Sequence, residues 1–506
     1  MPIYVRKADE VDVMFLAEGT YPYIRGGVSS WIAQILNGMP DIRFGICFIG
    51  SQSSDYTDIK YELPQNLVHL EVHYMFEDNS LPEVEKRRGD KQAFLEIEAL
   101  YEGFSKKSSD IPEALQEIEF YTKRVSFKDF LYSKKSWDFI TKIYKKNAAD
   151  VPFIDYFWTL RNIHKPIWLL ADIVTKMPKT KLFHAPSTGY AGFLGALASY
   201  DTKRPLLLTE HGIYTRERKI DMLSADWIEY KKPTLLQQPE EFNYIKKMWV
   251  QFFKRIGQFS YNRAELILSL FSAAREIEVS LGAPREKTRI IPNGVNVDSL
   301  REAYLKRNDA NSKLVITLIG RVVSIKDIKT FIRAVRICVG EIADLEAWIV
   351  GPTDEDKEYF RECQEMVDSF GLEQNVKFLG FQNIKDILPK TTLLTLTSIS
   401  EGMPLVILEG FAAGIPCVAT DVGSCRDLIE GGLNDEDIAL GAAGAVTGIA
   451  NPSELAEKYL YFLQNKQFWS EAQEVALKRV NKYYREDDFL DKYHQLYKEY
   501  MIKESS

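Results

Sequence analysis

Two glutamates stand eight positions apart, Glu401 in a loop and Glu409 within an apolar helical pattern. The apolar run 393–396 precedes the loop, and the helical pattern begins near Pro404. The first backbone N–H groups of a helix lack intrahelical acceptors and form a site for an anion. A carboxylate before such a helix can accept hydrogen bonds from sugar hydroxyls, and one farther along can hold a ribose diol. A capped helix with a solvated Glu409 is less favoured, because an unpaired carboxylate among apolar residues is costly.

The four residues after Glu401 are suited to close contact with a ligand. Gly402 lets a ligand approach the backbone, and Pro404 fits the first turn of a helix, where its missing N–H is no loss. Met403 and Leu405 belong to the same helix start. We therefore predict that these four residues bind the same ligand as the two glutamates.

Two cations, Arg321 and Lys326, follow another apolar run, 314–319. In open α/β sheets, ligands bind outside the carboxyl ends of the strands. A guanidinium offers a bidentate fork and an ammonium a compact point charge, so the two side chains could converge on a diphosphate. A solvated loop would also explain a lone arginine and lysine, but their position after a strand favours phosphate binding.

Weaker signals follow two apolar runs in the first half of the chain. Gly26 and Gly27 open a helical pattern after the run 11–16, as in a phosphate or acceptor loop, although such a glycine pair is often purely structural. Their spacing is not that of a dinucleotide-binding fingerprint. His211 follows the run 205–210, where an imidazole could reach a sugar hydroxyl or stabilise charge near a reacting carbon.

Three further groups resemble chemical motifs but have simpler explanations. The acidic stretch 354–356 resembles a metal-binding DxD motif, yet acidic residues that open a helix explain it. His69 and His73 have a metal-like spacing but no third ligand nearby in the sequence, so we expect them on the surface of a strand. Cys417 and Cys425 lack the context of a nucleophile. We therefore predict no metal site.

The composition limits the partners and the compartment. The chain of 506 residues has a formal net charge of −8, which disfavours nucleic acid and anionic lipid as partners. Five scattered cysteines without a CxxC pair indicate reduced thiols and a cytoplasmic protein. No apolar run approaches the ~20 residues of a membrane span. We expect any recruitment to the inner face of a membrane to depend on partner proteins.

Apolar runs alternate with helical patterns, which indicates an α/β fold with parallel sheets. The expected strands are 11–16, 42–49, 67–72, 181–184, 205–210, 265–271, 314–319, 345–350, 376–379, 393–396 and 417–419. We expect a first Rossmann-like domain at 1–305, with a helical insertion at about 82–177, and a second at 306–475. The polar segment 298–312 is expected to be a linker. Residues 476–506 form a C-terminal helix that could cap the second domain or cross back to the first.

Together these motifs resemble the retaining glycosyltransferases of family GT4, which have the GT-B fold of two Rossmann-like domains with parallel sheets facing across a cleft. The resemblance rests on Glu401 with Glu409, Arg321 with Lys326, and the Ile-Pro-Asn-Gly-Val turn at 291–295. The segments Glu-Gly-Thr-Tyr-Pro-Tyr at 18–23 and Arg-Gly-Gly-Val-Ser-Ser-Trp at 25–31, with the long insertion, are similar to the PelF transferases of Pel exopolysaccharide synthesis.

The resemblance implies a role for each candidate in the second domain. Arg321 and Lys326 would bind the diphosphate of a UDP-sugar. Glu409 would hold the ribose, and Glu401 with the backbone of 402–405 would hold the sugar hydroxyls. In the first, acceptor-binding domain, His211 would lie beside the sugar, and the glycine pair 26–27 would approach the phosphates. The chain departs from the family at 327, where glycine is common, and at 424–426, which leaves the donor sugar open.

The resemblance also implies the chemistry and the partners. A hexosyl group would pass, with retention of configuration, from the UDP-sugar to a growing polysaccharide, without a protein nucleophile or a metal cofactor. Inner-membrane components of an exopolysaccharide synthesis complex would be further partners. Two alternatives remain open. A nucleotide-sugar 2-epimerase on the same fold would convert the donor without an acceptor, and a non-catalytic scaffold would not be expected to keep the two glutamates and two cations together.

Overall fold

The computed structural model describes residues 3–77, 83–105, 113–148, 151–218, 244–306 and 313–503. Its contacts group the chain into two compact units. Unit 1 comprises Met1–Ser269, Arg275–Arg289 and Tyr493–Ser506, and unit 2 comprises Leu270–Ala274 and Ile290–Lys492. The chain therefore passes into unit 2 near Ile290, and its last residues belong to unit 1 again.

Unit 1 is built on an eight-stranded sheet with the order β1-β4-β3-β2-β5-β6-β7-β8. β1 runs antiparallel to β4, whereas β2 to β7 pair in parallel. β3 is buried along its whole length, as expected of a parallel strand covered on both faces. Six predicted strands coincide with β2 to β7, whereas β1 and β8 were not predicted. The strands are β1 (Ile3–Arg6), β2 (Glu10–Glu18), β3 (Phe44–Gly50), β4 (Leu67–Tyr74), β5 (Lys179–Ala185), β6 (Leu206–Glu210), β7 (Leu266–Ser269) and β8 (Thr288–Ile290).

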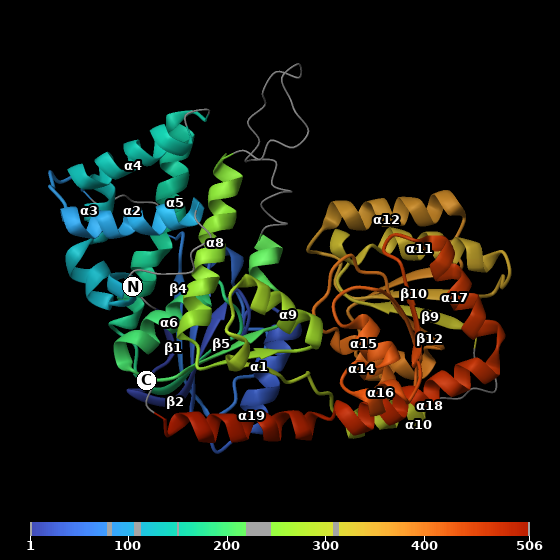
Figure 1. Ribbon diagram of the computed structural model, residues 1–506. Helices are drawn as coiled ribbons and strands as arrows, with labels where there is room; N and C mark the ends of the chain where they lie inside the picture. Colours follow the sequence, from blue (N-terminus) through green and yellow to red (C-terminus); the bar gives the residue numbers. More distant parts are fainter. Residues whose placement is uncertain are drawn as a thin grey trace. The chain divides into compact units, whose positions relative to one another are not determined.

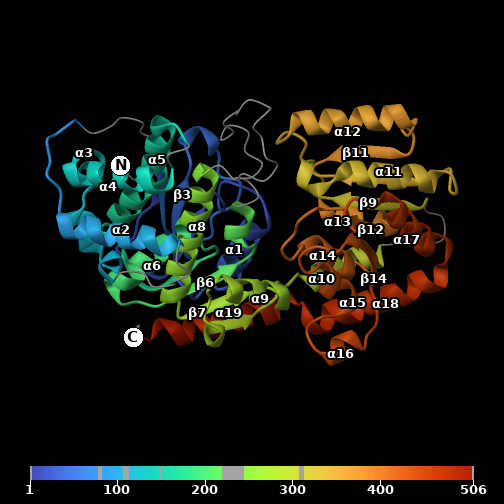
Figure 2. The same cartoon turned by 45° about the horizontal axis from the view of Figure 1, so that its top comes forward.

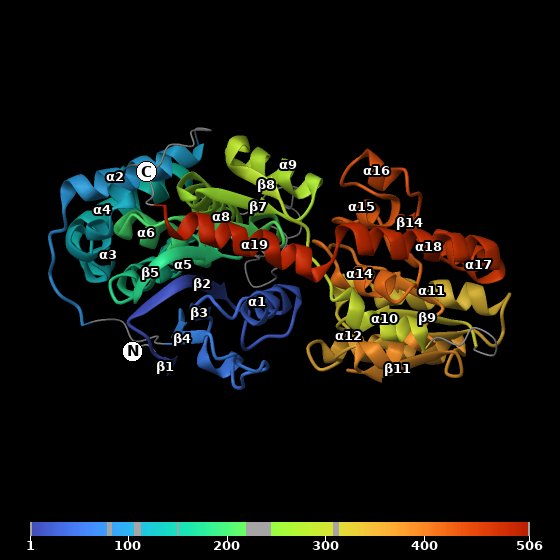
Figure 3. The same cartoon turned by 90° about the horizontal axis from the view of Figure 1, so that it is seen from below.

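Helices pack on this sheet because alternate strand residues point to opposite faces. On one face, Trp31 of α1 and Tyr497 of α19 contact the rings of Phe15 and Phe44. Figure 3 shows α1 and α19 side by side next to β2. On the other face, apolar side chains of α5, α6 and α8 join those of the sheet in one core. The helices are α1 (Gly27–Gly38), α2 (Lys91–Ser105), α3 (Phe127–Tyr132), α4 (Lys134–Asn147), α5 (Phe153–Val174), α6 (Tyr190–Thr202), α8 (Tyr244–Arg263), α9 (Ser272–Leu281) and α19 (Glu486–Met501).

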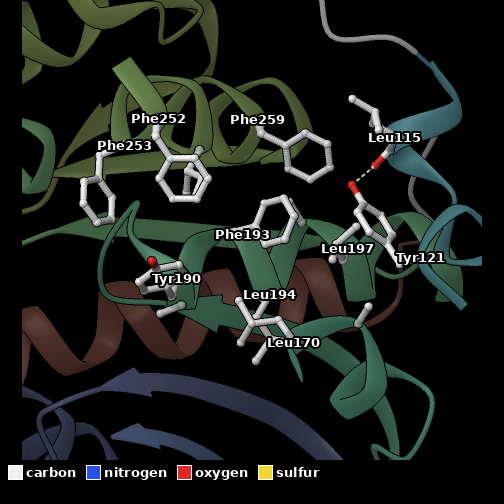
Figure 4. Close-up of a cluster of buried hydrophobic side chains, with 14 of the residues drawn as sticks. Leu115, Tyr121, Leu170, Tyr190, Phe193, Leu194, Leu197, Phe252, Phe253 and Phe259 are labelled. Atoms are coloured by element: carbon white, nitrogen blue, oxygen red, sulfur yellow. Dashed lines mark hydrogen bonds between the residues drawn. The ribbon is translucent and has the colours of Figure 1, made fainter. Parts of the chain in front are cut away.

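The segment expected to be a helical insertion, 82–177, contains α2 to α5 (Figure 2), while residues 82, 106–112 and 149–150 lie outside the described residues. Figure 4 shows the core next to it, in which Phe193 of α6 packs against Phe259 of α8 with ring centroids 5.0 Å apart. The Tyr121 hydroxyl donates a 2.7 Å hydrogen bond to the carbonyl of Leu115. The core of the inserted helices is thus continuous with the core of unit 1.

Unit 2 contains a six-stranded sheet with the order β11-β10-β9-β12-β13-β14, and every pairing is parallel. Counted from its own first strand, this order is 3-2-1-4-5-6, that of doubly wound nucleotide-binding folds. Two parallel-sheet α/β domains confirm the predicted fold class. The five predicted strands coincide with β9 to β13, whereas β14 was not predicted. The strands are β9 (Val315–Ile319), β10 (Glu346–Val350), β11 (Val376–Gly380), β12 (Leu393–Leu396), β13 (Cys417–Thr420) and β14 (Gly444–Thr447).

Helices cover both faces of the unit 2 sheet (Figure 1). The helices α11, α12 and α17 contribute to the core on one face, and α10, α14, α15 and α18 to the core on the other. Among the described residues of the whole chain, no helix combines the length and the apolar composition that a membrane span requires. The helices of unit 2 are α10 (Val297–Leu305), α11 (Ile328–Val339), α12 (Lys357–Phe370), α13 (Ile384–Ile387), α14 (Leu405–Ala412), α15 (Cys425–Glu430), α16 (Asp435–Ile438), α17 (Pro452–Gln464) and α18 (Lys466–Tyr483).

The prediction of a linker at 298–312 is wrong for the part of this segment that the structure describes. Most of that part is helix α10, and residues 307–312 lie outside the described residues. Val297 and Leu300 are buried in the core that α14 shares. Apolar residues three positions apart lie on one helix face, so a polar sequence with this spacing packs as a helix.

The expectation that His69 and His73 lie on a strand surface is also wrong. Both lie on β4, but their exposed fractions are only 2% and 8%. The physical reason is that β4 is not the edge strand, since β1 pairs along its outer side. The backbone N–H of Ala8 donates to Nδ1 of His69 at 3.2 Å. Glu71, between the two histidines on the same strand face, is 1% exposed.

The last turns of α19 are anchored in unit 1 by buried polar contacts. The Tyr497 hydroxyl lies 2.8 Å from Nδ1 of His184, and the Thr209 hydroxyl lies 2.8 Å from Nε2 of the same ring. Burial lowers the pKa of His184 to about 3, with a smaller contribution from the nearby His211. The ring is therefore neutral at pH 7, with one nitrogen that donates and one that accepts.

We expect Tyr497→Phe to destabilise unit 1, because it leaves a fully buried nitrogen of His184 without its partner. The free energy of unfolding should fall by about 1–3 kcal/mol, measured by urea denaturation. Tyr500→Phe is the matched control, since that half-buried ring contacts Lys503, just after the end of the helix. Equal losses in the two variants would contradict the role of the His184 contact.

Candidate functional site

The candidate site lies at the carboxyl ends of β9 and β12 in unit 2. These strands are neighbours in the sheet, yet α11, which follows β9, packs on one face and α14, which follows β12, on the other. The two connections therefore diverge, and such a topological switch point leaves a crevice where ligands bind in open α/β sheets. The predicted cations follow β9, and the predicted glutamates follow β12.

Lys326 and Glu401 meet at this switch point. The ammonium of Lys326 donates to Oε1 of Glu401, and the two side chains are 20% and 13% exposed. The 3-10 turn η7 (Ser324–Lys326) positions the lysine, whose side chain folds back over Gly320 at the end of β9. The Thr397 hydroxyl holds the turn by donating to the carbonyl of Lys326 at 2.8 Å.

Glu401 is held by its neighbours as well as by the lysine. The Ser398 hydroxyl donates to Oε1 at 2.5 Å. Gly423, after β13, packs directly against the backbone of 401–402 at φ +56°, where an added Cβ would lie 2.3 Å from the carbonyl oxygens of Glu401 and Gly402. Only glycine fits there, because the position needs both a left-handed conformation and a close approach. Contacts within unit 2 therefore hold the Glu401 carboxylate in place.

Helix α14 begins one residue after Pro404, which is its N-cap. Met403, just before it, accepts the backbone N–H of Asn293 at its sulfur, 3.3 Å away. The first N–H groups of α14 have no acceptor within the helix and lie directly after the Glu401 loop. This start of α14 suits an anion, and anion binding there stays a prediction.

Glu409 is half-buried on α14, and no described residue hydrogen-bonds its carboxyl group. Burial raises the pKa of Glu409 to about 7. A polar group in this setting costs free energy unless a ligand partners it. Glu409, the predicted ribose-binding residue, thus has no side-chain hydrogen bond or ion pair with any described residue.

Arg321 is not brought to the Lys326–Glu401 pair in this structure. Its guanidinium donates to Glu355 at 2.5 Å, with both side chains about half exposed. Asp356 is the N-cap of α12 and accepts the backbone N–H of Tyr359 at 3.0 Å. The acidic stretch 354–356 therefore opens a helix, as the sequence indicated, and its glutamate is the partner of Arg321.

The structure accounts for Asp327, where the family commonly has glycine, and for the two cysteines of this unit near the site. Asp327 has a left-handed backbone with φ 44°, which is the reason for a glycine preference at this position. Its side chain caps α11 by accepting the N–H of Thr330. Burial raises the pKa of Cys425 to about 12 and that of Cys417 well above its ordinary value, so neither thiol is a nucleophile.

The remaining predicted residues lie in unit 1. Gly26 is the N-cap of α1 and Gly27 its first residue, with open space where a side chain would begin. His211 follows β6 and lies edge-on to Trp31, with ring centroids 4.6 Å apart. Burial lowers the pKa of His211 to about 3, and Nε2 has no hydrogen-bonding partner among the described residues. A neutral imidazole can hydrogen-bond a hydroxyl, but it adds no positive charge.

Sequence reasoning missed the residues that hold the candidates in place: Thr397, Ser398 and Gly423. Their hydroxyls and small size were visible in the sequence, since two hydroxyl residues end the run of β12. Their partners are 71 and 3 positions away for the two hydroxyls, so only the fold identifies the first of these contacts.

Comparison with known proteins assigns the two halves of the chain separately. Residues 11–286, more than half of the chain, match the family model described as a domain of unknown function, DUF3492. The chain belongs to the DUF3492 family. Residues 313–465 of this DUF3492 protein match the model described as glycosyl transferases group 1.

Curated relatives match about a third of the chain. Lipopolysaccharide 1,6-galactosyltransferase of Salmonella typhimurium is 27% identical over 196 residues, which are 37% of this chain and 52% of the relative. UDP-Gal:alpha-D-GlcNAc-diphosphoundecaprenol alpha-1,3-galactosyltransferase of Escherichia coli is 28% identical over 180 residues, 32% of this chain and 45% of the relative. The chain thus spans about half the length of the curated relatives that it matches.

Solved glycosyltransferase structures share the fold over nearly the whole chain. Anabaena Alr3699/HepE, solved with UDP, has a TM-score of 0.58 at 17% identity, covering 96% of this chain and 100% of that one. Sucrose-phosphate synthase of Thermosynechococcus elongatus has a TM-score of 0.56 at 14% identity, covering 96% of this chain and 98% of that one. At these identities the likeness establishes the GT-B fold alone.

The raised pKa makes Glu409 a pH-dependent cost to folding. The group titrates near 4.5 in an unfolded chain and near 7 in the folded protein. Between these values the folded state holds a proton that the unfolded chain has lost, so the free energy of unfolding falls as pH rises, by up to about 3 kcal/mol. We expect Glu409→Gln to remove this loss, so that the variant gains stability over wild type between about pH 5 and pH 8.

Urea denaturation across this pH range measures the difference between variant and wild type. Taking the difference cancels Glu210 and Glu278, whose pKa values burial also raises. Glu358→Gln, at a side chain 80% exposed, is the control and should follow wild type at every pH. A constant difference between Glu409→Gln and wild type would contradict the burial of this carboxyl group.

Proposed function

We propose that the protein is a retaining glycosyltransferase that moves a hexosyl group from a UDP-sugar to a growing polysaccharide, an exopolysaccharide of the Pel kind. The observation that carries the proposal is the meeting of Lys326 and Glu401 at the switch point of unit 2, next to the start of α14. The matched relatives are named as galactosyltransferases of lipopolysaccharide and undecaprenol-linked sugars. Alr3699/HepE was solved with UDP and with UDP-glucose, which supports a UDP-sugar donor.

In this proposal the donor lies along the carboxyl ends of β9 and β12. Lys326 and the first N–H groups of α14 bind the diphosphate, because both supply positive charge. Glu409 accepts hydrogen bonds from the ribose hydroxyls, which supply the partners that no described residue gives its carboxyl group. Glu401 accepts hydroxyls of the sugar. One of its oxygens already receives Lys326 and Ser398, which leaves the other oxygen for the sugar.

Arg321 would join the diphosphate by exchanging partners. Its ion pair with Glu355 is half exposed, and such a pair contributes little stability. A bidentate contact with a phosphate is stronger than an exposed ion pair, so donor binding can draw the guanidinium away. Glu355 then returns to solvent at small cost.

Catalysis in this proposal is electrostatic. The acceptor hydroxyl oxygen bonds to the anomeric carbon from the face that the diphosphate leaves, the carbon–oxygen bond to phosphate breaks, and the hydroxyl proton passes to the departing phosphate oxygen. Lys326, Arg321 and the start of α14 stabilise the negative charge that grows on the leaving group. No protein nucleophile is needed, which is consistent with protonated, buried cysteines in this unit. Unit 1 would bind the acceptor, with the neutral His211 as a hydrogen-bonding group for a hydroxyl.

The decisive experiment measures binding and turnover with UDP-, GDP- and ADP-sugars. A UDP-sugar should bind most tightly, and UDP should be released only when an acceptor polysaccharide is present. Conversion of the donor to an epimer without acceptor would instead identify an epimerase. Failure to bind any nucleotide sugar would instead favour the non-catalytic scaffold. The finer assignments, retention and the Pel-type acceptor, are tested by the anomeric configuration and the chain length of the product.

We expect Lys326→Ala and Arg321→Ala each to weaken UDP binding by about 1.5–3 kcal/mol, because each loses a charge-assisted contact. This corresponds to roughly a 10- to 150-fold rise in Kd by calorimetry. Lys313→Ala is the matched control, since that lysine pairs with Glu346 at the opposite, amino end of β9. Wild-type UDP affinity in both site variants would refute the phosphate assignment.

Transfer should need no exchangeable divalent metal, because the cations and the helix start would balance the leaving diphosphate. Initial rates measured directly after addition of excess EDTA should remain nearly unchanged. Complete loss of activity, restored by magnesium or manganese, would overturn this proposal and make the acidic stretch 354–356 a metal-ligand candidate. Initial rates are the appropriate measure, because added cations also speed the release of a diphosphate product.

A further inference from the structure

A second group of chemically active side chains lies on β3 and β4 of unit 1. β4 places His69, Glu71 and His73 on one face, because residues two positions apart on a strand point to the same side. β3 runs parallel to β4 and places Cys47 directly opposite Glu71. One ligand atom from each of Cys47, Glu71 and His73 lies within 4.8 Å of the others.

These side chains are buried and incompletely partnered. Cys47, Glu71 and His73 are 0%, 1% and 8% exposed. Oε1 of Glu71 and Nε2 of His73 have no hydrogen-bonding partner among the described residues. The ring nitrogen of His73 lies 3.4 Å from Oε2 of Glu71, longer than a good hydrogen bond. Buried polar atoms in this state are rare, and each calls for a partner from outside the chain.

The types of ligand atom in this group identify the metal ion that would bind there. A thiolate, an imidazole nitrogen and a carboxylate oxygen are the three ligand types of zinc, whereas magnesium and calcium avoid sulfur. The charges also balance, since thiolate and carboxylate together neutralise a divalent cation. A neutral complex is what a fully buried site requires, because an uncompensated charge there would be costly. Three protein ligands would leave the fourth tetrahedral position to a water molecule.

His69 has a different place in the cluster. Its Nδ1 accepts the backbone N–H of Ala8, so in the neutral ring the proton is on Nε2. That nitrogen faces Oε2 of Glu71 at 3.8 Å. Tyr4 of β1 lies edge-on to the same ring, with centroids 5.9 Å apart. His69 thus approaches the carboxylate without a hydrogen bond, from outside the ligand set, where second-sphere partners of metal sites lie.

We propose that Cys47, Glu71 and His73 bind one Zn²⁺ in unit 1, with His69 as a positioning residue. The metal would join β3 to β4, and through His69 and Ala8 it would fix β1 as the outer strand. The thiol proton of Cys47 is released to solvent when its sulfur binds the ion. This site is independent of the proposed transfer reaction and of the question whether that reaction uses a metal.

The test supplies metal while the chain folds, because the site is enclosed. The full-length protein is expressed in minimal medium with zinc, or separately with cobalt, and its metal content is measured by mass spectrometry. We expect one equivalent of zinc per chain. The cobalt form should show a near-ultraviolet thiolate-to-cobalt charge-transfer band and the visible bands of tetrahedral cobalt.

Variants separate ligands from neighbours. Cys47→Ser and His73→Gln should lose the metal and the thiolate band, and their thermal midpoint should no longer respond to added zinc. Cys338→Ser, at a buried thiol of unit 2, and His164→Gln, at a buried histidine of unit 1, should keep both. His69→Gln should keep the band but bind about 10- to 100-fold more weakly.

Two results would overturn the proposal. The first is wild-type protein without zinc or cobalt, in which case Glu71 shares a proton with an imidazole instead of a metal. The second is a thiolate band that survives in Cys47→Ser or disappears in Cys338→Ser. Loss of the band in His69→Gln would overturn the three-ligand assignment. Circular dichroism of each variant confirms that loss of metal is not loss of fold.

Discussion

The pairing of β9 with β12 in parallel is the constraint on which unit 2 depends. The connections of these strands leave toward opposite faces of the sheet, and one backbone hydrogen bond, from the N–H of Ile399 to the carbonyl of Ile325 at 2.9 Å, joins the two loops. The Lys326–Glu401 ion pair joins them as well, with the hydroxyls of Thr397 and Ser398 holding each side. An anion that binds here must share Lys326 with Glu401. The ion pair that joins the loops is thus also the contact that a donor diphosphate would alter.

Buried carboxyl groups differ in how the fold treats them. Glu210 receives hydrogen bonds from Thr188 and Tyr261, and Glu278 receives one from Ser269, so part of the cost of burial is offset. Glu409 receives none from the described residues, although burial raises the pKa of all three. The first two are partnered parts of unit 1. Glu409 retains an unmet requirement that a ribose could fill, at a cost in stability that natural proteins accept at functional sites.

In unit 1, polar groups far apart in the chain close over one another. Tyr497 of the last helix meets His184 of β5, and Cys47 of β3 meets Glu71 of β4. Each contact gives a buried polar group a neighbour that it could not find locally. The two cases differ in completeness, because the nitrogens of His184 are satisfied, whereas Glu71 and its histidines keep unpartnered atoms.

The sequence by itself determined most strands of both sheets, since buried parallel strands are continuous apolar runs and are legible one at a time. It also determined the positions of Lys326, Glu401 and Glu409 relative to their own strands and helices. It did not determine β1, β8 or β14, which are short and not continuously apolar, or the burial of His69 and His73. Those depend on which strand lies next to which, as do the partner of Arg321 and the neighbours of Glu71. Strand neighbours are set by the packing of the whole sheet, whereas a local pattern records only whether a residue faces an apolar environment.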